Sequence, residues 1–324
     1  ATGDTVVLQA YDAYYGGWSD DQYKNVLIQQ VSESSARRQM LETGEAHLSE
    51  SFSNTDLEAL SGNESLYTYQ ADTWNNCIVF LNSQKTPCDN VDFRKALQYS
   101  FPYAETIDSV MAGNAVQSYG LVPSGMWAHD STLFQYNTDM DKAREYLEAS
   151  GVDTDGLTLT VTYSSSYPEY SSALQLWQAN LLDLGINLEL RAMEWDAQWA
   201  EAQATNPEDR QDILIMRWWP DYASPSSWFD SLVHSEDSVT FNLAYIDSPE
   251  LDQLIEDAGL NVSTNRAEAE RLYIEAQQIL IDEAYMINIF DDTHTYVVNN
   301  SITGVYENPA YSTVVSYYNV RKNG

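Results

Sequence analysis

The stretch ILIMRWWPDYASP, residues 213–225, joins a short apolar run to a turn that is rich in aromatic residues and proline. The run at 213–216 is typical of a buried strand, and Pro220 and Pro225 prevent a strand or helix from continuing through the turn. Open α/β sheets bind ligands at the edge where their strands end. Asp221, directly after this strand, is therefore a candidate ligand anchor.

The same turn supports two interpretations. In the first, the Asp221 carboxylate binds a ligand, and Trp218, Trp219 and Tyr222 supply flat apolar walls beside it. In the second, the turn packs against its own domain and Asp221 caps a helix over residues 226–233. This stretch alone favours the second interpretation.

Strands and helices alternate on both sides of this turn. Strands that alternate with helices of ten or more residues predict βαβ units and a largely parallel sheet, so we expect an α/β fold. The predicted strands are 157–163, 186–192, 213–216, 285–290 and 293–298, and the predicted helices are 91–100, 103–111, 139–150, 171–184, 195–204, 249–258 and 265–283.

The first part of the chain has the pattern of a smaller α/β unit. Its predicted elements are strand 25–31, helix 34–43 closed by Gly44, strand 46–50, helix 56–60 and strand 76–81. The polar, proline-containing segment 82–87 predicts a domain crossing. A strand at 314–320 has no neighbouring partner in sequence, and we expect it to return to the first unit.

Composition narrows the classes of partner. Aspartate and glutamate number 49 against 15 lysines and arginines, which gives a formal net charge of −34. Such a surface repels nucleic acid and anionic membranes, so we expect neutral or cationic partners. No apolar run is long enough to span a bilayer. Residues 1–10 lack the layout of a signal peptide, so the protein is cytosolic or its export signal lies outside this chain.

Cysteine, histidine and short motifs give little support for a metal site or an enzyme. Cys77 and Cys88 are too few for a disulfide framework or a four-cysteine zinc site, and they form either one disulfide or two reduced thiols. The histidines are scattered, so we expect no metal and no cofactor. The motifs of serine hydrolases, P-loop proteins and dinucleotide enzymes are missing. Paired carboxylates such as Glu194 with Asp221 leave a glycoside hydrolase as an alternative.

Several motifs occur in the order found in one protein family. They are YYGG at 14–17, ARRQMLETGE at 36–45, FLN at 80–82 followed by VDFRKAL at 91–97, GLVPSGMW at 120–127, DKAREYL at 141–147, and the segment 218–225. Together they make the chain resemble the dipeptide- and oligopeptide-binding members of the solute-binding proteins of ABC transporters, family 5. The resemblance covers the carboxyl-terminal part of that family's sequences.

This resemblance implies a fold and a division into lobes. The implied fold is α/β and periplasmic-binding-protein-like (type II, cluster C), with one complete α/β lobe and part of the second. Residues 1–83 would form part of lobe I, 84–299 lobe II, and 300–324 a return to lobe I, with hinge crossings near Asn82 and Asn299.

The resemblance also implies a function. The chain would belong to a monomeric, extracytoplasmic component of an ABC importer that binds short peptides in an interlobe cleft. That component would deliver the peptide to membrane permease subunits, and it would be held at the membrane by a lipid anchor outside this chain. It would not be an enzyme. The same family also includes proteins that bind oligosaccharides or metal chelates, and these remain alternatives.

Site residues follow from the matching positions. In peptide-binding relatives an aspartate that matches Asp221 pairs with the α-amino group of the ligand, and a tryptophan that matches Trp218 lines the adjacent pocket. A carboxylate paired with an ammonium group avoids the cost of burying an unpaired charge. Trp219, Tyr222 and Trp195 would add flat walls. Phe290 and Asp291, at the end of a predicted strand, either touch the ligand or stabilise the hinge.

Overall fold

The computed structural model describes residues 5–311 and 314–323, and their contacts divide the chain into two compact units. Unit 1 contains the described residues up to Thr73 and from Thr293 onward, and unit 2 is Trp74–Asp292. The chain thus changes unit before the predicted link at 82–87, because that link belongs to unit 2: the Asn82 side chain is buried there and donates to the Gln211 carbonyl oxygen at 2.9 Å. The assignment of the units to lobes I and II stays a prediction.

Unit 2 contains most of the secondary structure. Two long strands, β4 (Leu66–Leu81) and β9 (Met286–Asn299), run through both units. The other elements of unit 2 are α3 (Val91–Ser100), α4 (Tyr103–Glu105), a π-helical turn (Thr106–Val110), β5 (Ala115–Gln117), α5 (Met140–Ser150), β6 (Thr158–Ser164), α6 (Pro168–Asp183), β7 (Asn187–Met193), α7 (Trp195–Ala202), a 3₁₀ turn (Pro207–Asp209), β8 (Ile213–Trp218), α8 (Ser226–Leu232), α9 (Pro249–Asn261) and α10 (Arg266–Glu283).

The sheet of unit 2 is mixed, whereas the sequence predicted a largely parallel one. The strand order is β9-β4-β8-β6-β7, with β5 paired to β9. Strand β6 is parallel to β7 and β8, as the βαβ pattern predicted. Strand β4 pairs with β8 in the antiparallel direction, with Ile78 opposite Met216. It comes from the earlier part of the chain, so no crossover helix constrains its direction.

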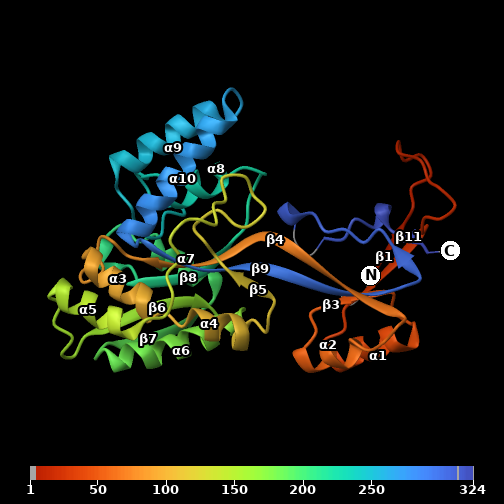
Figure 1. Cartoon of the computed structure of the whole chain (residues 1–324), viewed down its shortest axis with the longest axis horizontal. Coiled ribbons are helices and arrows are strands. Elements are labelled where there is room, and N and C mark those ends of the chain that lie inside the picture. The colour runs from red at the N-terminus through yellow and green to blue at the C-terminus, as the bar shows by residue number, and fades with distance from the viewer. Residues whose placement is uncertain (1–4, 312–313, 324) are drawn as a thin grey trace. The chain divides into compact units, whose positions relative to one another are not determined.

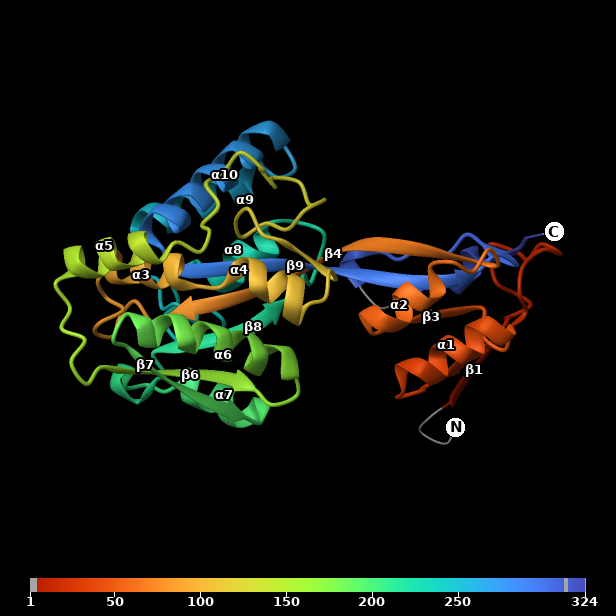
Figure 2. The ribbon, with the colours of Figure 1, turned by 60° about the horizontal axis from the view of Figure 1, so that its bottom comes forward.

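Apolar residues cover both faces of this sheet. Alternate residues of β8 enter two different cores: Ile213 and Ile215 join one, and Leu214 and Met216 join the other. The first core is covered by α3, α5 and α6, and the second by α8, α9 and α10. Figure 1 shows α9 and α10 side by side, and Figure 2 shows α6 on the opposite side of the strands. Because both faces are buried, residues 213–216 of β8 are all apolar rather than alternating with polar residues.

Local signals set the ends of the helices. The Asp139 side chain accepts from the Lys142 amide and caps α5, which ends at Gly151 in the left-handed conformation. Asn90 caps α3 in the same way. Helix α1 (Ser34–Thr43) ends at Gly44, with φ of 75°. These helices therefore begin and end close to the predicted residues.

Strand β9 is one continuous strand where the sequence predicted two, 285–290 and 293–298. The acidic pair Asp291 and Asp292 lies between these two predicted strands. Both side chains are buried, and each has a hydrogen-bond partner. Asp291 accepts from Ser118, and Asp292 accepts from Arg217. Acidic residues inside a strand are compatible with its continuation when their carboxylates are paired.

Unit 1 is smaller. Its elements are β1 (Thr5–Gln9), β2 (Asn25–Gln29), α1, β3 (Leu48–Glu50), α2 (Asn54–Leu60), β10 (Ile302–Thr303), two 3₁₀ turns (Pro309–Tyr311 and Tyr317–Asn319) and β11 (Arg321–Lys322). Strand β1, which pairs antiparallel with β2, was not predicted. The predicted strand 314–320 is wrong: Val315 forms a single bridge with Glu307, and a 3₁₀ turn follows. That segment does return to unit 1.

The structure also decides the state of the cysteines and describes the helices in relation to a bilayer. Cys77 and Cys88 are buried free thiols, and burial raises the pKa of both. Of the helices in the described part of the chain, none combines the length and the apolar character needed to cross a bilayer.

Gly304 offers a test of the return of the chain to unit 1. Its φ is +75°, and a Cβ at this position would overlap the backbone carbonyl oxygen of Asn319. We expect Gly304→Ala to lower the free energy of unfolding by about 1–2 kcal/mol or more, from left-handed strain and this overlap. Denaturant unfolding followed by circular dichroism measures the change.

Gly62→Ala is the matched control, because nothing lies within 4 Å of the added Cβ. Equal stability of the two variants would show that the segment around Gly304 does not pack as described.

Candidate functional site

The end of β8 sends two adjacent side chains to opposite faces of the sheet. Arg217 enters the side covered by α6, where it contacts Glu169 and Tyr170. Trp218 is only 8% exposed and belongs to the core on the other side. The turn that carries Asp221 begins immediately after Trp218, so these two residues determine how the turn leaves the sheet.

Arg217 is a partly buried cation with two carboxylate partners. Its Nε lies 2.8 Å from Asp292 Oδ2, and its Nη1 lies 2.7 Å from Glu169 Oε1. The backbone amide of Arg217 donates to the Tyr170 hydroxyl at 2.8 Å. Burial works against the charge of Arg217, but Asp292 together with smaller contributions from Cys77 and Tyr170 outweighs it and holds the arginine pKa above its ordinary value. Strand β8, helix α6 and strand β9 are thus joined at one point.

The turn after Trp218 presents exposed side chains on a fixed backbone. Trp219 is 55% exposed, Tyr222 is 50% exposed, and Asp221 is exposed. The Asp221 amide donates to Ser227 Oγ at 2.9 Å, which ties the turn to the start of α8. The N-cap of α8 is Pro225, with no side-chain cap. The interpretation of Asp221 as the cap of this helix is therefore wrong, and its carboxylate has no such structural task.

Tyr222 lies close enough to Asp230 of α8 to affect the ionisation of that carboxyl. Burial raises the pKa of Asp230, while His234 and a hydrogen bond from Tyr222 act in the opposite direction. The Tyr222 side chain thus lies near α8. Its partial exposure leaves ring surface available beside Asp221.

Four aromatic rings connect Trp195 to Trp218, and we call them the aromatic ladder. The ring centroids of Trp195 and Trp199 are 5.3 Å apart, those of Trp199 and Phe241 are 4.7 Å apart, and those of Phe241 and Trp218 are 5.0 Å apart. The sequence prediction named Trp195 and Trp218 but missed Trp199 and Phe241. Trp199 follows Trp195 by one helical turn, and this spacing is a signal that could have found it. Phe241 lies on a loop and gives no such signal.

Phe290 lies apart from the other predicted site residues. It is 2% exposed and belongs to the core on the Arg217 side, with the Arg217 guanidinium 5.5 Å from its ring centroid. The structure thus brings together Asp221, Trp218, Trp219 and Tyr222 on one turn and joins Trp195 to them through the aromatic ladder. It places Phe290 beneath the ion-pair network.

Asp291, which the sequence predicted either to touch the ligand or to stabilise the hinge, is a buried carboxylate. It accepts from Ser118 Oγ at 2.7 Å and from the Ser124 amide at 3.0 Å. Burial raises its pKa to about 6, against the effect of these two hydrogen bonds and of His129. Its neighbour Asp292 pairs with Arg217, so adjacent carboxylates attach β9 to two different segments of unit 2.

Comparison with known proteins decides the family. A sequence model described as "Bacterial extracellular solute-binding proteins, family 5 Middle" matches residues 1–239. The chain belongs to this family. Its members are binding components of transport systems and not enzymes, so the glycoside hydrolase hypothesis is not carried forward.

Individual members of family 5 are similar over most of the chain. The chain is 28% identical over 329 residues to the probable D,D-dipeptide-binding periplasmic protein DdpA of Escherichia coli K12, covering 99% of the chain and 60% of that protein. This family 5 chain therefore spans less than two thirds of the length of that relative.

Solved structures of similar proteins confirm the α/β fold of this family 5 chain. A putative peptide-binding protein AppA from Clostridium difficile superposes with a TM-score of 0.86 at 19% identity, covering 100% of this chain and 66% of that one. NikA from Brucella suis, in complex with Fe(III)-EDTA, gives a TM-score of 0.82 at 18% identity, covering 99% and 66%. Identities this low establish the fold alone.

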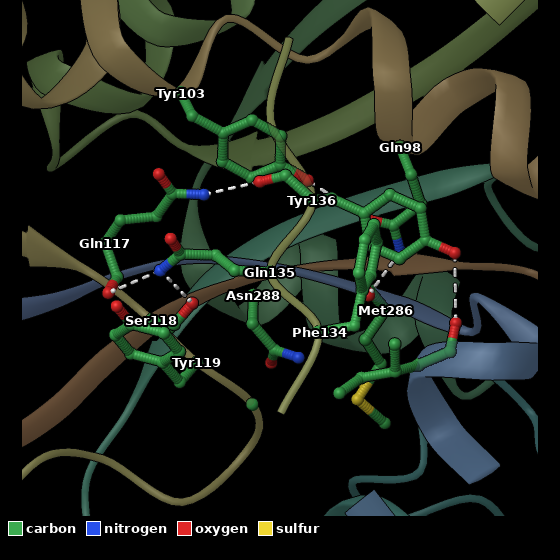
Figure 3. A pocket seen from close by; sticks show the side chains of 12 residues that line it. Gln98, Tyr103, Gln117, Ser118, Tyr119, Phe134, Gln135, Tyr136, Met286 and Asn288 are labelled. Carbon is green, nitrogen blue, oxygen red and sulfur yellow. Dashed lines mark hydrogen bonds between the residues drawn. The ribbon is translucent and has the colours of Figure 1, made fainter. Parts of the chain in front are cut away.

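One cavity of unit 2 is too small for a peptide. It has a volume of about 20 Å³, room for one water molecule. Figure 3 shows its polar wall, where Gln117 donates to the Tyr136 carbonyl at 2.6 Å and Gln135 donates to the Ser118 carbonyl at 3.1 Å. None of the predicted site residues lines it.

A larger cavity, of about 1100 Å³, lies within unit 1. It is lined by parts of β2, α1 and β3 together with the carboxyl-terminal segment, and it contains none of the predicted site residues. Within residues 5–311 and 314–323, no three His, Cys, Asp or Glu side chains gather closely enough to hold a metal ion.

Asp291 leads to a pH prediction. An unfolded aspartate has a pKa of about 3.9, whereas Asp291 in the folded chain has a pKa of about 6. Because the folded state binds the proton more tightly, this group stabilises the fold fully below about pH 4. The contribution, on the order of 3 kcal/mol, is lost as the pH rises through about 6.

We expect the stability of the wild-type protein relative to Asp291→Asn to fall between pH 4 and pH 7. Urea unfolding at several pH values measures it. Asp155→Asn, an exposed aspartate in the same unit, controls for the change in net charge. Wild-type and Asp291→Asn curves that run parallel over this range would contradict the assignment.

Proposed function

We propose that this chain forms the ligand-binding part of an extracytoplasmic solute-binding protein, which holds a short peptide by its amino terminus and delivers it to an ABC permease. The observation that carries the proposal is the exposed Asp221 carboxylate, on a turn whose backbone is fixed at both ends. Arg217 and Trp218 hold one end in the sheet, and Ser227 holds the other.

The chemistry of the turn fits an ammonium group. A primary ammonium carries three donors, and a carboxylate accepts them in charge-assisted hydrogen bonds. Trp219 and Tyr222 expose ring faces next to Asp221, and such faces attract a cation. The net charge of −34 adds a long-range attraction for cationic ligands. An anchor of this kind recognises the amino terminus of the peptide. The side chains of the peptide would contact other parts of the binding site.

Membership of family 5 supports the transport role. The name of the Escherichia coli relative specifies a D,D-dipeptide and a periplasmic location. By analogy we place the present protein outside the cytoplasm, as a monomer held at the membrane by a lipid anchor, with permease subunits as its protein partners. Phe290, beneath Arg217, would then stabilise the wall and make no direct contact with the ligand.

The second candidate is a ligand of another class in the same fold. NikA was solved with Fe(III)-EDTA, and exposed aromatic faces such as that of Trp195 also stack on sugar rings. Neither a metal chelate nor an oligosaccharide offers the ammonium group that would use Asp221. The peptide is therefore the stronger proposal.

The test is peptide affinity in the intact protein, measured by isothermal titration calorimetry. Charge-assisted hydrogen bonds contribute about 1.5–3 kcal/mol, so we expect Asp221→Asn to weaken the binding of a free tripeptide by about tenfold to 150-fold. Acetylation of the peptide amino group should weaken wild-type binding similarly and add little to the effect of Asp221→Asn.

Asp237→Asn, at an exposed position of unit 2, is the control for the change in charge. Equal affinity of wild type and Asp221→Asn for the free peptide would overturn the anchor assignment. The protein can also be titrated with cello-oligosaccharides and with Fe(III)-EDTA. Binding of one of these ligands without binding of any peptide would favour the second candidate.

A further inference from the structure

Asn76 is a polar side chain enclosed within unit 2. It lies in the part of β4 that pairs with β8, directly opposite Trp218, the residue after which the turn with Asp221 leaves the sheet. Asn76 is 0% exposed. Because a buried amide without partners is costly, the partners of Asn76 indicate what this residue does in the fold.

Both ends of the Asn76 amide group are used. Its Nδ2 donates to the Leu121 carbonyl oxygen at 2.8 Å, and its Oδ1 accepts from Trp228 Nε1 at 3.1 Å. A backbone carbonyl can only accept and an indole N–H can only donate, so these two partners require one donor and one acceptor from the side chain between them. Asparagine supplies both, whereas leucine, which has a similar shape, supplies neither.

The first partner of Asn76 belongs to the loop 118–129, and this loop is fixed by other elements as well. The Val122 amide donates to Gln277 Oε1 at 3.0 Å, and Gln277 Nε2 donates to the Ala128 carbonyl oxygen at 2.9 Å. Gln277 lies on α10 and is itself buried. The loop therefore gives Asn76 a support that does not depend on the turn with Asp221.

The second partner lies next to the residue that holds the far end of that turn. We call residues 219–225 the anchor turn. The Asp221 amide donates to Ser227 Oγ at 2.9 Å, and Ser227 is followed directly by Trp228. Trp228 is 0% exposed, and its backbone amide donates to the Pro225 carbonyl oxygen at 2.9 Å. The bond from the Trp228 indole to β4 thus fixes the start of α8, to which the anchor turn is tied.

Both ends of the anchor turn therefore lead to Asn76. The backbone of Asn76 is paired with Trp218, where the turn starts, and its side chain holds Trp228, close to where the turn ends. One residue thus constrains the separation and the direction of the two ends. A binding group that is fixed before the ligand arrives loses less conformational freedom on binding, which favours affinity.

We propose that Asn76 is a positioning residue, which holds the start of α8 against β4 and so directs the Asp221 carboxylate toward the amino group of the ligand. This inference rests on the proposed peptide-binding function and names a determinant of its selectivity for a free amino terminus. Asn76 itself is enclosed and makes no contact with the ligand. Its effect passes through Trp228 and Ser227 to the backbone of Asp221.

The experiment uses the intact protein and one tripeptide in two forms, with a free and with an acetylated amino group. The ratio of the two dissociation constants, measured by calorimetry, reports how well Asp221 uses the ammonium group. In the wild type we expect a ratio of about tenfold to 150-fold, from a charge-assisted hydrogen bond. Asn76→Leu should reduce the ratio to about threefold or less, because hydrogen bonds weaken steeply when their geometry is lost. A wild-type ratio in Asn76→Leu would overturn the proposal.

Asn82→Leu is the matched control. Asn82 follows the last residue of β4 and is also buried, and its side chain donates to the Gln211 carbonyl oxygen at 2.9 Å and accepts from the Gln84 amide at 3.2 Å. Both variants lose two buried hydrogen bonds, so both should unfold at a lower urea concentration than the wild type. Only Asn76→Leu should lose the preference for the free peptide. An equal loss of preference in both variants would show a general structural effect and overturn the positioning role.

A measurement without ligand separates this inference from the proposed function. The Asp221 amide is protected from hydrogen exchange by its bond to Ser227. We expect this amide to exchange about five- to tenfold faster in Asn76→Leu than in Asn82→Leu, the effect of losing one hydrogen bond. If no peptide binds even to the wild type, the proposed function fails, and faster exchange still supports the control of the anchor turn by Asn76. Equal exchange in the two variants overturns it.

A second variant keeps the inference testable if Asn76→Leu does not fold. Trp228→Phe removes the indole donor to Asn76 and leaves the bond to Leu121 in place. Trp177→Phe is its control, because Trp177 is also buried and donates to Ser100 Oγ at 2.9 Å, in the core on the other face of the sheet. We expect only Trp228→Phe to lower the ratio of the two dissociation constants. A wild-type ratio in Trp228→Phe would overturn the proposal.

Discussion

The ion-pair network of Arg217 is the constraint on which the rest of unit 2 depends. A single guanidinium joins β8 to Glu169 at the start of α6 and to Asp292 in β9. Asp292 is the last residue of β9 that belongs to unit 2. Removing one member of such a buried network would leave an uncompensated charge, which is strongly destabilising. Because Arg217 is held on one face of the sheet, the next side chain, Trp218, enters the other face. The turn with Asp221 then leaves the sheet in one defined direction.

Much of the fold could be predicted from the sequence, and the reasons are local. The ends of α1 and α5 are set by Gly44 and Gly151, and the three parallel strands of unit 2 follow from regular alternation with helices. The remainder depended on contacts distant in sequence. Strand β9 continues through Asp291 and Asp292 only because Ser118 and Arg217 are there to pair with them. The segment at 314–320 has the composition of a strand, but only Val315 finds a bridge partner.

The candidate site also has a part that could be predicted from local sequence and a part that depends on contacts distant in sequence. Asp221, Trp218, Trp219 and Tyr222 lie in one short stretch of sequence, so their proximity could be predicted. The connection of Trp195 to Trp218 could not, since it passes through Phe241 on a loop whose position is set by Glu236 and Asn242. The position of Phe290 under Arg217 also depended on the tertiary structure.

We propose Asp221 as the receptor for a primary ammonium group, with Trp218 beside it in the sequence. The most direct measurement is a crystal structure of the intact protein with a short peptide bound. We expect the amino nitrogen of the peptide to lie about 2.7–2.9 Å from a carboxylate oxygen of Asp221, as in other charge-assisted hydrogen bonds. A bound peptide whose amino terminus contacts another residue and leaves Asp221 in solvent would contradict it.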